Sequence, residues 1–194
     1  AAIFARLLAE KNGDTISTVA NTRFTDIPAH AWYSGYAKYL NNNGVTYGKS
    51  KTIFAPDDAI TRAEFTTLAV RFFDVYGDGD AEIMEQYKDF NDVSDGYWAA
   101  AYIKAAAKHG WINGYEDGTF RPNNTITRAE VTTIVNRMLG RAADKDYVDS
   151  HKDQLRQFPD VAQTNWAYYN IVEATNAHDY EKSGGTEDWT GLAD

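Results

Sequence analysis

The sequence contains no cysteine among its 194 residues, which excludes disulfide frameworks, thiol catalysis and thiolate metal sites. It has no apolar run long enough to span a membrane and no secretory signal. Because it opens at Ala1 without an initiator methionine, we expect a fragment, in which case a missing signal peptide carries no information. Positive charge is also scarce, since 19 lysines and arginines face 28 acidic residues and the net charge is −9. This balance argues against broad binding to nucleic-acid phosphates.

The residues that are present repeat with a period of 66. A shift by this number aligns the two copies without a gap, and the matched pairs include Phe24 with Phe90, Trp32 with Trp98, Lys38 with Lys104, Gly48 with Gly114 and Arg71 with Arg137. A third copy starts near Phe158, at a shift of 68, and leaves the pattern after about Ala177. The expected divisions are the second helix of a truncated preceding repeat (1–20), repeats at 24–76 and 90–141, a degenerate or truncated repeat (158–194), and linkers at 77–89 and 142–157.

A hexapeptide that occurs twice, Ile60–Phe65 and Ile126–Val131, predicts the start of a helix in each copy. Its threonine is a good N-cap residue, and its glutamate stands three positions later, where it completes a capping box. The flanking apolar residues suit a hydrophobic staple. We therefore expect structural capping roles for Thr61, Glu64, Thr127 and Glu130.

The arginine that follows each of these threonines, Arg62 or Arg128, is not explained by capping. It adds positive charge to the helix end that is already positive, which is a local electrostatic cost. Such a cost is offset if an anion docks beside the free N–H groups of the helix N-terminus. The alternative is a solvated surface arginine or a structural salt bridge.

Each repeat is expected to contain a first helix, a glycine-rich loop and a second helix. Apolar spacing places the first helices at about 31–42, 97–108 and 166–177. The loop dipeptides Asn113-Gly114 and Asp117-Gly118 favour turns, which short paired strands would flank. The hexapeptide then opens the second helix.

The loop from Gly110 to Pro122, followed by Ile-Thr-Arg-Ala-Glu at 126–130, resembles the S-layer homology (SLH) domain family. The match is near-ideal at 90–141, keeps the frame at 24–76, and extends over only the first half of the third copy. The resemblance implies a mainly α fold of three pseudo-threefold-related helix–loop–helix repeats. These repeats would form a compact helical bundle with prongs, with short β-turn or strand pieces in the loops.

The same resemblance implies non-covalent anchoring at the bacterial cell surface or S-layer, outside the cell. In this family, grooves between repeats bind a secondary cell-wall polysaccharide, often pyruvylated, and the arginine of Thr-Arg-Ala-Glu is implicated in binding. Carried onto this sequence, those arginines are Arg62 and Arg128. No cofactor, nucleic acid or membrane insertion is expected.

Further candidates for glycan contact recur between copies or flank the loop. Trp32, Trp98 and Trp166 could stack on sugars, although their helical spacing is more typical of core residues. The other candidates are Lys38 and Lys104 as groove charges, Gly48 and Gly114 as turn glycines that a ligand could approach, and Trp111 and Tyr115 as sugar-contacting rings.

The sequence gives no clear indication of a metal site. The acidic run 78–82 lacks EF-hand spacing and indicates a solvated linker, and the four histidines show no metal spacing.

Two functions other than glycan anchoring remain open. Paired carboxylates could instead serve a glycan-acting enzyme, although capping or helix starts account for the recurring ones, such as Asp26 and Asp92. The protein could also be a structural scaffold that packs against other S-layer subunits.

Overall fold

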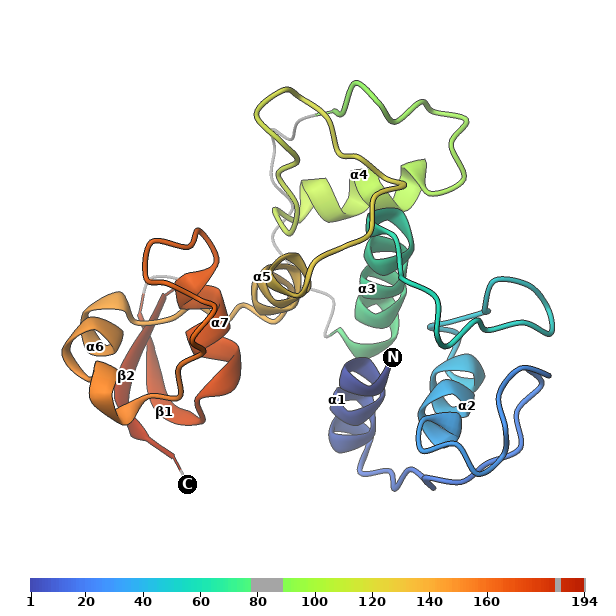
Figure 1. Cartoon of the computed structure of the whole chain (residues 1–194), viewed down its shortest axis with the longest axis horizontal. Helices are drawn as coiled ribbons and strands as arrows, with labels where there is room; N and C mark the ends of the chain where they lie inside the picture. The colour runs from blue at the N-terminus through green and yellow to red at the C-terminus, as the bar shows by residue number, and fades with distance from the viewer. Residues whose placement is uncertain (78–88, 184–185, 194) are drawn as a thin grey trace.

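The computed structural model describes residues 1–77, 89–183 and 186–193, and this part of the chain is mainly helical, as the sequence predicts (Figure 1). The acidic run 78–82 lies outside the described residues, as does most of the 77–89 linker. The elements in chain order are α1 (Ala2–Asn12), α2 (Ser34–Asn42), α3 (Arg62–Tyr76), α4 (Ala100–Lys108), α5 (Arg128–Met138), α6 (Lys145–Ser150), the 3-10 helix η1 (Lys152–Gln154), α7 (Tyr168–Thr175), β1 (His178–Ser183) and β2 (Thr186–Leu192).

The first helices begin two or three residues later than predicted, at Ser34, Ala100 and Tyr168. Consecutive tight turns precede the first of them: the Ala31 N–H bonds to the Pro28 carbonyl and the Ser34 N–H to the Ala31 carbonyl, both at 2.9 Å. Because the tryptophan of each copy falls in these turns, it does not share the buried face of the helix.

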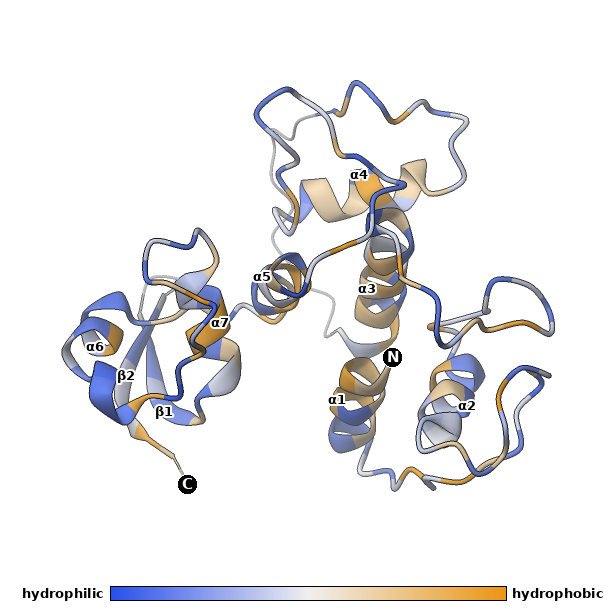
Figure 2. Cartoon of the chain, in the orientation of Figure 1, coloured by the Kyte–Doolittle hydropathy of each residue, from blue (hydrophilic) through white to orange (hydrophobic). Residues whose placement is uncertain are grey.

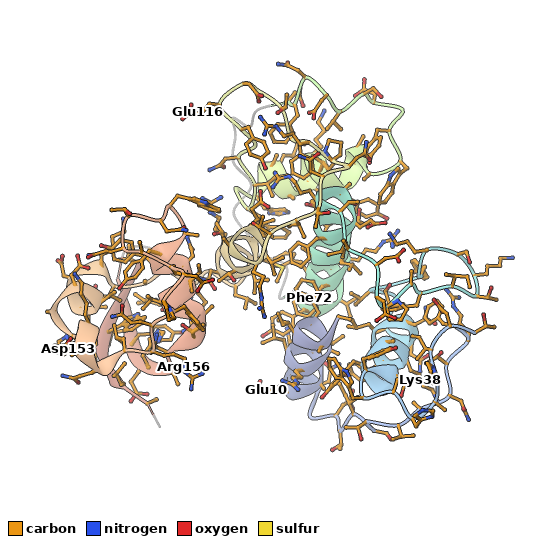
Figure 3. All side chains as sticks on the ribbon, in the orientation of Figure 1. Glu10, Lys38, Phe72, Glu116, Asp153 and Arg156 are labelled. Carbon is orange, nitrogen blue, oxygen red and sulfur yellow. The ribbon has the colours of Figure 1, made fainter. Side chains whose placement is uncertain are left out.

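Each second helix packs on the first helix of the following copy. The contacts pair α1 with α2, α3 with α4, and α5 with α7, while α3 also contacts α1 and α5. Phe72 lies where α3 meets α1 and stacks on Phe4 with ring centroids 4.6 Å apart (Figure 3). Figure 2 shows hydrophobic residues along both of these helices. The helix α1 therefore occupies the place that a preceding repeat's second helix would take.

The third copy departs from the repeat at the predicted point but takes a form that the sequence did not predict. An antiparallel hairpin, β1 paired with β2, follows α7 in place of a second helix. It contributes Trp189 to a small separate core with Val148, Leu155, Tyr168 and Val172. Three equivalent repeats are therefore not present in the described residues.

The prediction of short paired strands in the glycine-rich loops was wrong. Within the described loops, tight turns replace them: the Tyr115 N–H bonds to the Thr119 carbonyl at 2.8 Å and the Gly118 N–H to the Tyr115 carbonyl at 3.0 Å. A lone β-bridge joins Thr61 to Thr125, between the two copies.

Asp26 and Asp92 hold these loops against the start of their own repeat rather than starting helices, which corrects the sequence interpretation. Asp26 accepts hydrogen bonds from the Phe54 and Ala55 N–H groups, and Asp92 does the same for Phe120 and Arg121. Burial alone would raise the pKa of Asp26, but these backbone donors hold it below its ordinary value.

The turn glycines Gly48 and Gly114 are required by both conformation and packing. Their φ angles are +74° and +68°, in the left-handed region that side chains rarely adopt. A Cβ on Gly48 would meet the ring of Phe24 at 2.6 Å, and one on Gly114 would meet the ring of Phe90. The loop backbone thus lies directly on the aromatic residue that opens each copy.

We predict that Gly114→Ala lowers the free energy of unfolding by about 3 kcal/mol, because overpacking strain adds to the cost of a left-handed alanine. Gly13 is the matched control, since its φ is +69° and nothing lies within 4 Å of an added Cβ. Gly13→Ala should cost about 1 kcal/mol, the conformational part alone. Urea denaturation measures both, and equal losses would contradict the packing role of Gly114.

Candidate binding grooves

Two equivalent grooves lie where a second helix meets the segment that follows it. The first groove, of about 610 Å³, is lined by the Thr46–Lys49 turn, one face of α3 and Trp98. The second groove, of about 750 Å³, is lined by the Ile112–Asp117 turn, one face of α5 and Trp166. The pairs that correspond at a shift of 66 include Gly48 with Gly114, Lys49 with Tyr115, Glu64 with Glu130, Thr67 with Thr133 and Arg71 with Arg137.

Both predicted capping boxes are present, and they fix a glutamate at the edge of each groove. The Thr61 hydroxyl accepts from the Glu64 N–H at 3.2 Å, and Glu64 accepts from the Thr61 N–H at 2.9 Å. Thr127 and Glu130 repeat the pattern at 3.3 and 2.8 Å. In the first groove, Glu64 also pairs with Lys49 at 2.5 Å.

The N-terminus of α3 is not open to an anion, so that part of the sequence prediction was wrong. The Arg62 N–H donates to the Asn124 carbonyl at 2.9 Å and the Ala63 N–H to the Pro122 carbonyl at 3.0 Å. The next two N–H groups bond within the helix cap. The loop of the following repeat therefore satisfies the donors that a ligand would have used.

The side chain of Arg62 is 7% exposed and crosses from α3 to the second repeat. Its Nε donates to the Phe120 carbonyl at 2.7 Å, and its Nη1 forms an ion pair with Glu130. Its guanidinium lies 4.9 Å from the ring centre of Tyr115. The salt-bridge alternative is thus the one that the structure contains, although Arg62 also lines the second groove.

The ion pair with Arg62 is one of the contacts that act on the pKa of Glu130. Burial would raise the pKa of Glu130, but the Thr127 N–H and the Arg62 charge hold it below its ordinary value. The Tyr115 hydroxyl also donates to Glu130 at 3.0 Å. Burial, the largest effect, raises the pKa of Tyr115. The three side chains form one wall of the second groove.

Arg128, the equivalent of Arg62, is exposed at the start of α5 and lines neither groove. The structure therefore does not bring the two hexapeptide arginines into one site. Lys38 on α2 and Lys104 on α4 are also exposed, and neither of them lines a groove.

The three recurring tryptophans lie on the surface, so the core interpretation of these residues was wrong. Trp98 is 57% exposed in the first groove and Trp166 is 65% exposed in the second. Trp32 is 66% exposed and lies outside both grooves. Trp111 also lines the second groove, but it is only 3% exposed and its indole packs on His109 and Phe73, which leaves little of the ring accessible to a sugar.

Arg71 and Arg137 are groove residues that the sequence reasoning did not select. Arg71 donates to the Tyr102 hydroxyl at 3.0 and 3.2 Å, and Arg137 donates to the Trp111 carbonyl at 3.3 Å. No carboxylate among the described residues forms an ion pair with either of them. Burial lowers the pKa of Arg137, the effect expected for a desolvated cation without a nearby counter-charge. The sequence feature that could have identified them is their alignment at the 66-residue shift.

These features define a mainly helical tandem-repeat protein with one groove between the first and second repeats and another between the second repeat and the third segment. The sequence model of the S-layer homology domain matches residues 23–66 and 89–132. The chain is 34% identical over 184 residues to a cellulosome-anchoring protein of Acetivibrio thermocellus, an alignment that covers 93% of this chain and 38% of that protein. It is 32% identical over 131 residues to a surface-layer 125 kDa protein of Lysinibacillus sphaericus. That alignment covers 66% of this chain and 11% of the relative.

This chain therefore contains two tandem domains of the S-layer homology family, as the sequence resemblance indicates. It spans well under half the length of these relatives, and only 8% of cell surface glycoprotein 1 of Acetivibrio thermocellus, to which it is 31% identical over 188 residues. No helix in the described part of the chain combines the length and apolar character needed to cross a membrane.

We predict that Arg62→Met lowers the free energy of unfolding by about 3 kcal/mol, because it leaves Glu130 without its partner and removes the link to the Phe120 carbonyl. Arg128→Met is the matched control, because the same change at an exposed position should stay within about 0.5 kcal/mol. Denaturant titration of both variants measures the difference. Similar losses would contradict the role of Arg62 as a tie between repeats.

The pH dependence of the stability lost in Arg62→Met separates the contribution of the ion pair from that of side-chain packing. The folded-state pKa of Glu130 lies below its ordinary value of 4.5, so its ionised form stabilises the protein above that pH. This contribution is lost as the pH falls through the lower, folded-state value. The deficit of Arg62→Met should therefore shrink between pH 7 and about pH 3. A constant deficit would attribute the loss to packing alone.

Proposed function

We propose that this chain is a non-covalent cell-surface anchoring module whose grooves bind an anionic cell-wall polysaccharide. The observation that carries the proposal is the repeated composition of the grooves. Each of them combines an arginine that has no carboxylate partner among the described residues, an exposed tryptophan and a turn glycine.

The groove arginines suit a carboxylate on a glycan, such as that of a pyruvate ketal. A guanidinium presents paired N–H donors that match the two oxygens of a carboxylate. Arg71 in the first groove and Arg137 in the second take this role, while Arg62 holds the wall of the second groove in place. We assign no ligand contact to Arg128, which serves as a control.

The exposed indoles of Trp98 and Trp166 complete each groove with a flat apolar face, on which a sugar ring stacks. Trp32 occupies the equivalent turn outside both grooves. Two grooves on one chain can engage the same polymer strand, so the second contact forms at a high effective concentration. A polymer with repeated carboxylates thus binds more tightly than a single sugar unit.

The names of the relatives support a location on the bacterial cell surface, since one is a cellulosome-anchoring protein and another a surface-layer protein. Others are named as enzymes, such as an endo-1,4-beta-xylanase A of Thermoanaerobacterium saccharolyticum, of which this chain covers only 9%. Because the segment shared with this chain is a small part of that enzyme, we interpret it as a module attached to a separate catalytic domain.

The pKa values of three groove carboxylates also favour binding over glycan hydrolysis. A glycosidase acid needs a raised pKa. Asp117 accepts hydrogen bonds from Thr119 and Arg121, which lower its pKa to about 2. The pKa values of Glu64 and Glu130 also lie below their ordinary values, although burial acts to raise them. These three groups stay ionised at neutral pH.

We expect Arg71→Gln and Arg137→Gln each to weaken binding of purified cell-wall polymer by about tenfold or more, the value of one charge-assisted hydrogen-bond pair. Calorimetric titration with polymer before and after removal of its pyruvate groups measures this effect. Arg128→Gln should bind like the wild-type protein. The variant that carries both changes should also lose discrimination between the two polymer forms.

Two outcomes would count against this mechanism. Equal binding of pyruvylated and depyruvylated polymer would exclude the carboxylate contact. No binding of either form, combined with concentration-dependent self-association in light scattering, would support a protein scaffold.

The tryptophans allow a separate comparison between residues of similar exposure. Trp98→Ala and Trp166→Ala should each weaken polymer binding by about tenfold, because each removes the stacking face of one groove. Trp32→Ala, outside both grooves, should have little effect on affinity. Calorimetry with the same polymer checks the three variants, and equal losses for all of them would contradict the groove assignment.

A further inference from the structure

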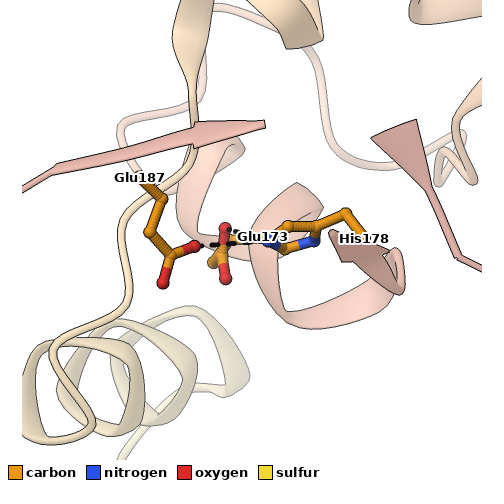
Figure 4. A group of neighbouring side chains, drawn as sticks. All are labelled: Glu173, His178 and Glu187. Atoms are coloured by element: carbon orange, nitrogen blue, oxygen red, sulfur yellow. Dashed lines mark hydrogen bonds and ion pairs between the residues drawn. The ribbon is translucent and has the colours of Figure 1, made fainter. Parts of the chain in front are cut away.

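A buried polar cluster lies in the third segment, away from the residues that line the grooves. It contains Glu173 from α7, His178 from β1, Glu187 from β2 and Arg141 from the segment after α5. The histidine side chain is fully buried and each glutamate side chain is 1% exposed. Figure 4 shows the two carboxylates and the imidazole converging from separate elements.

Arg141 divides the carboxylate oxygens of this cluster into two sets. Its Nη2 lies 2.9 Å from Oε1 of Glu173, and its Nε lies 2.7 Å from Oε1 of Glu187. The second oxygen of each carboxylate, Oε2, faces Nε2 of His178 instead, at 3.6 and 3.2 Å. Oε2 of Glu173 is buried and accepts no hydrogen bond from any donor in the described part of the chain.

The orientation of His178 places the lone pair of Nε2 in the cluster. Its Nδ1 lies 2.8 Å from the Asn176 carbonyl, which can only accept, so Nδ1 carries the proton of the neutral ring. Trp189 stacks on the imidazole with ring centroids 3.6 Å apart and holds it in this plane. The arrangement, an imidazole fixed by a backbone carbonyl behind it, is typical of metal-ligating histidines.

The cluster carries more negative charge than Arg141 neutralises. Two carboxylates face one guanidinium, and an uncompensated buried charge is costly. A further positive charge at this point would remove the excess.

We propose that Glu173, His178 and Glu187 form a binding site for a divalent transition-metal ion of the zinc type. The ligand atoms would be Oε2 of each glutamate and Nε2 of the histidine. Zinc bonds of about 2.0–2.2 Å in a tetrahedral arrangement separate the ligand atoms by about 3.3 Å, close to the two distances observed. A mixed imidazole and carboxylate set suits such an ion.

Arg141 lies behind this site and forms ion pairs with the Oε1 atoms of both carboxylates. Its Nη2 also lies 3.1 Å from Nε2 of His178. An ion would take over that lone pair while Nη2 keeps its bond to Glu173. The ligands come from α7, β1 and β2, so a bound ion would join the hairpin to the helix beneath it. Such a staple suits a small core in a chain without disulfides.

The test is zinc binding by the whole 194-residue chain after removal of metal with a chelator. We expect about one equivalent of bound Zn²⁺ by elemental analysis and a thermal midpoint that rises with zinc concentration. Co²⁺ in place of zinc should give visible absorption bands typical of a low-coordinate site. Glu173→Gln and His178→Gln should abolish the stoichiometric zinc and the Co²⁺ bands.

Glu173→Gln is the more informative variant, because it leaves one carboxylate for one guanidinium and keeps the fold balanced without metal. Its midpoint in chelator should equal or exceed that of the metal-free wild-type protein, yet zinc should no longer raise it. His30→Gln, which removes an exposed histidine elsewhere, should bind zinc like the wild type. No bound zinc, or equal zinc binding in all variants, would overturn the proposal and leave a proton as the counter-charge.

Discussion

The architecture of the first two repeats depends on the contact between α3 and the loop of the repeat that follows it. Two loop carbonyls accept from the N-terminal N–H groups of α3, and Arg62 reaches across to Phe120 and Glu130. One short segment thus closes a helix end, joins two repeats and builds a groove wall. An exposed arginine side chain at this position would neither join the two repeats nor build the groove wall.

Local chemistry was predictable from the sequence, and long-range pairing was not. The capping boxes depend on residues three positions apart, so both appear where the hexapeptide predicts them. The partner of Arg62 lies 68 residues away, and no local pattern identifies it. Helical spacing wrongly indicated that the recurring tryptophans are core residues, because they lie in the turns that precede the helices and not in the helices themselves.

The third segment illustrates the same limit. The loss of the repeat pattern after about Ala177 was visible in the sequence, but the hairpin was not, because its stability depends on Trp189 packing against Tyr147 and His178. Likewise, histidine spacing indicated no metal ligands, whereas folding brings His178 to two glutamates from different elements. Pairing between elements, rather than periodicity, decides such sites.

The pairing of each second helix with the next first helix has a consequence for how the protein can be divided. The unit that repeats in the sequence begins at Phe24, whereas the unit that encloses a groove begins at the turn after a first helix and ends at the next tryptophan. The two units are out of phase by about a third of the 66-residue period. A gene cut at the sequence boundaries would leave the turn and the second-helix face of each groove together but remove its tryptophan, Trp98 or Trp166. Duplication and shuffling therefore conserve complete grooves only when neighbouring repeats travel together.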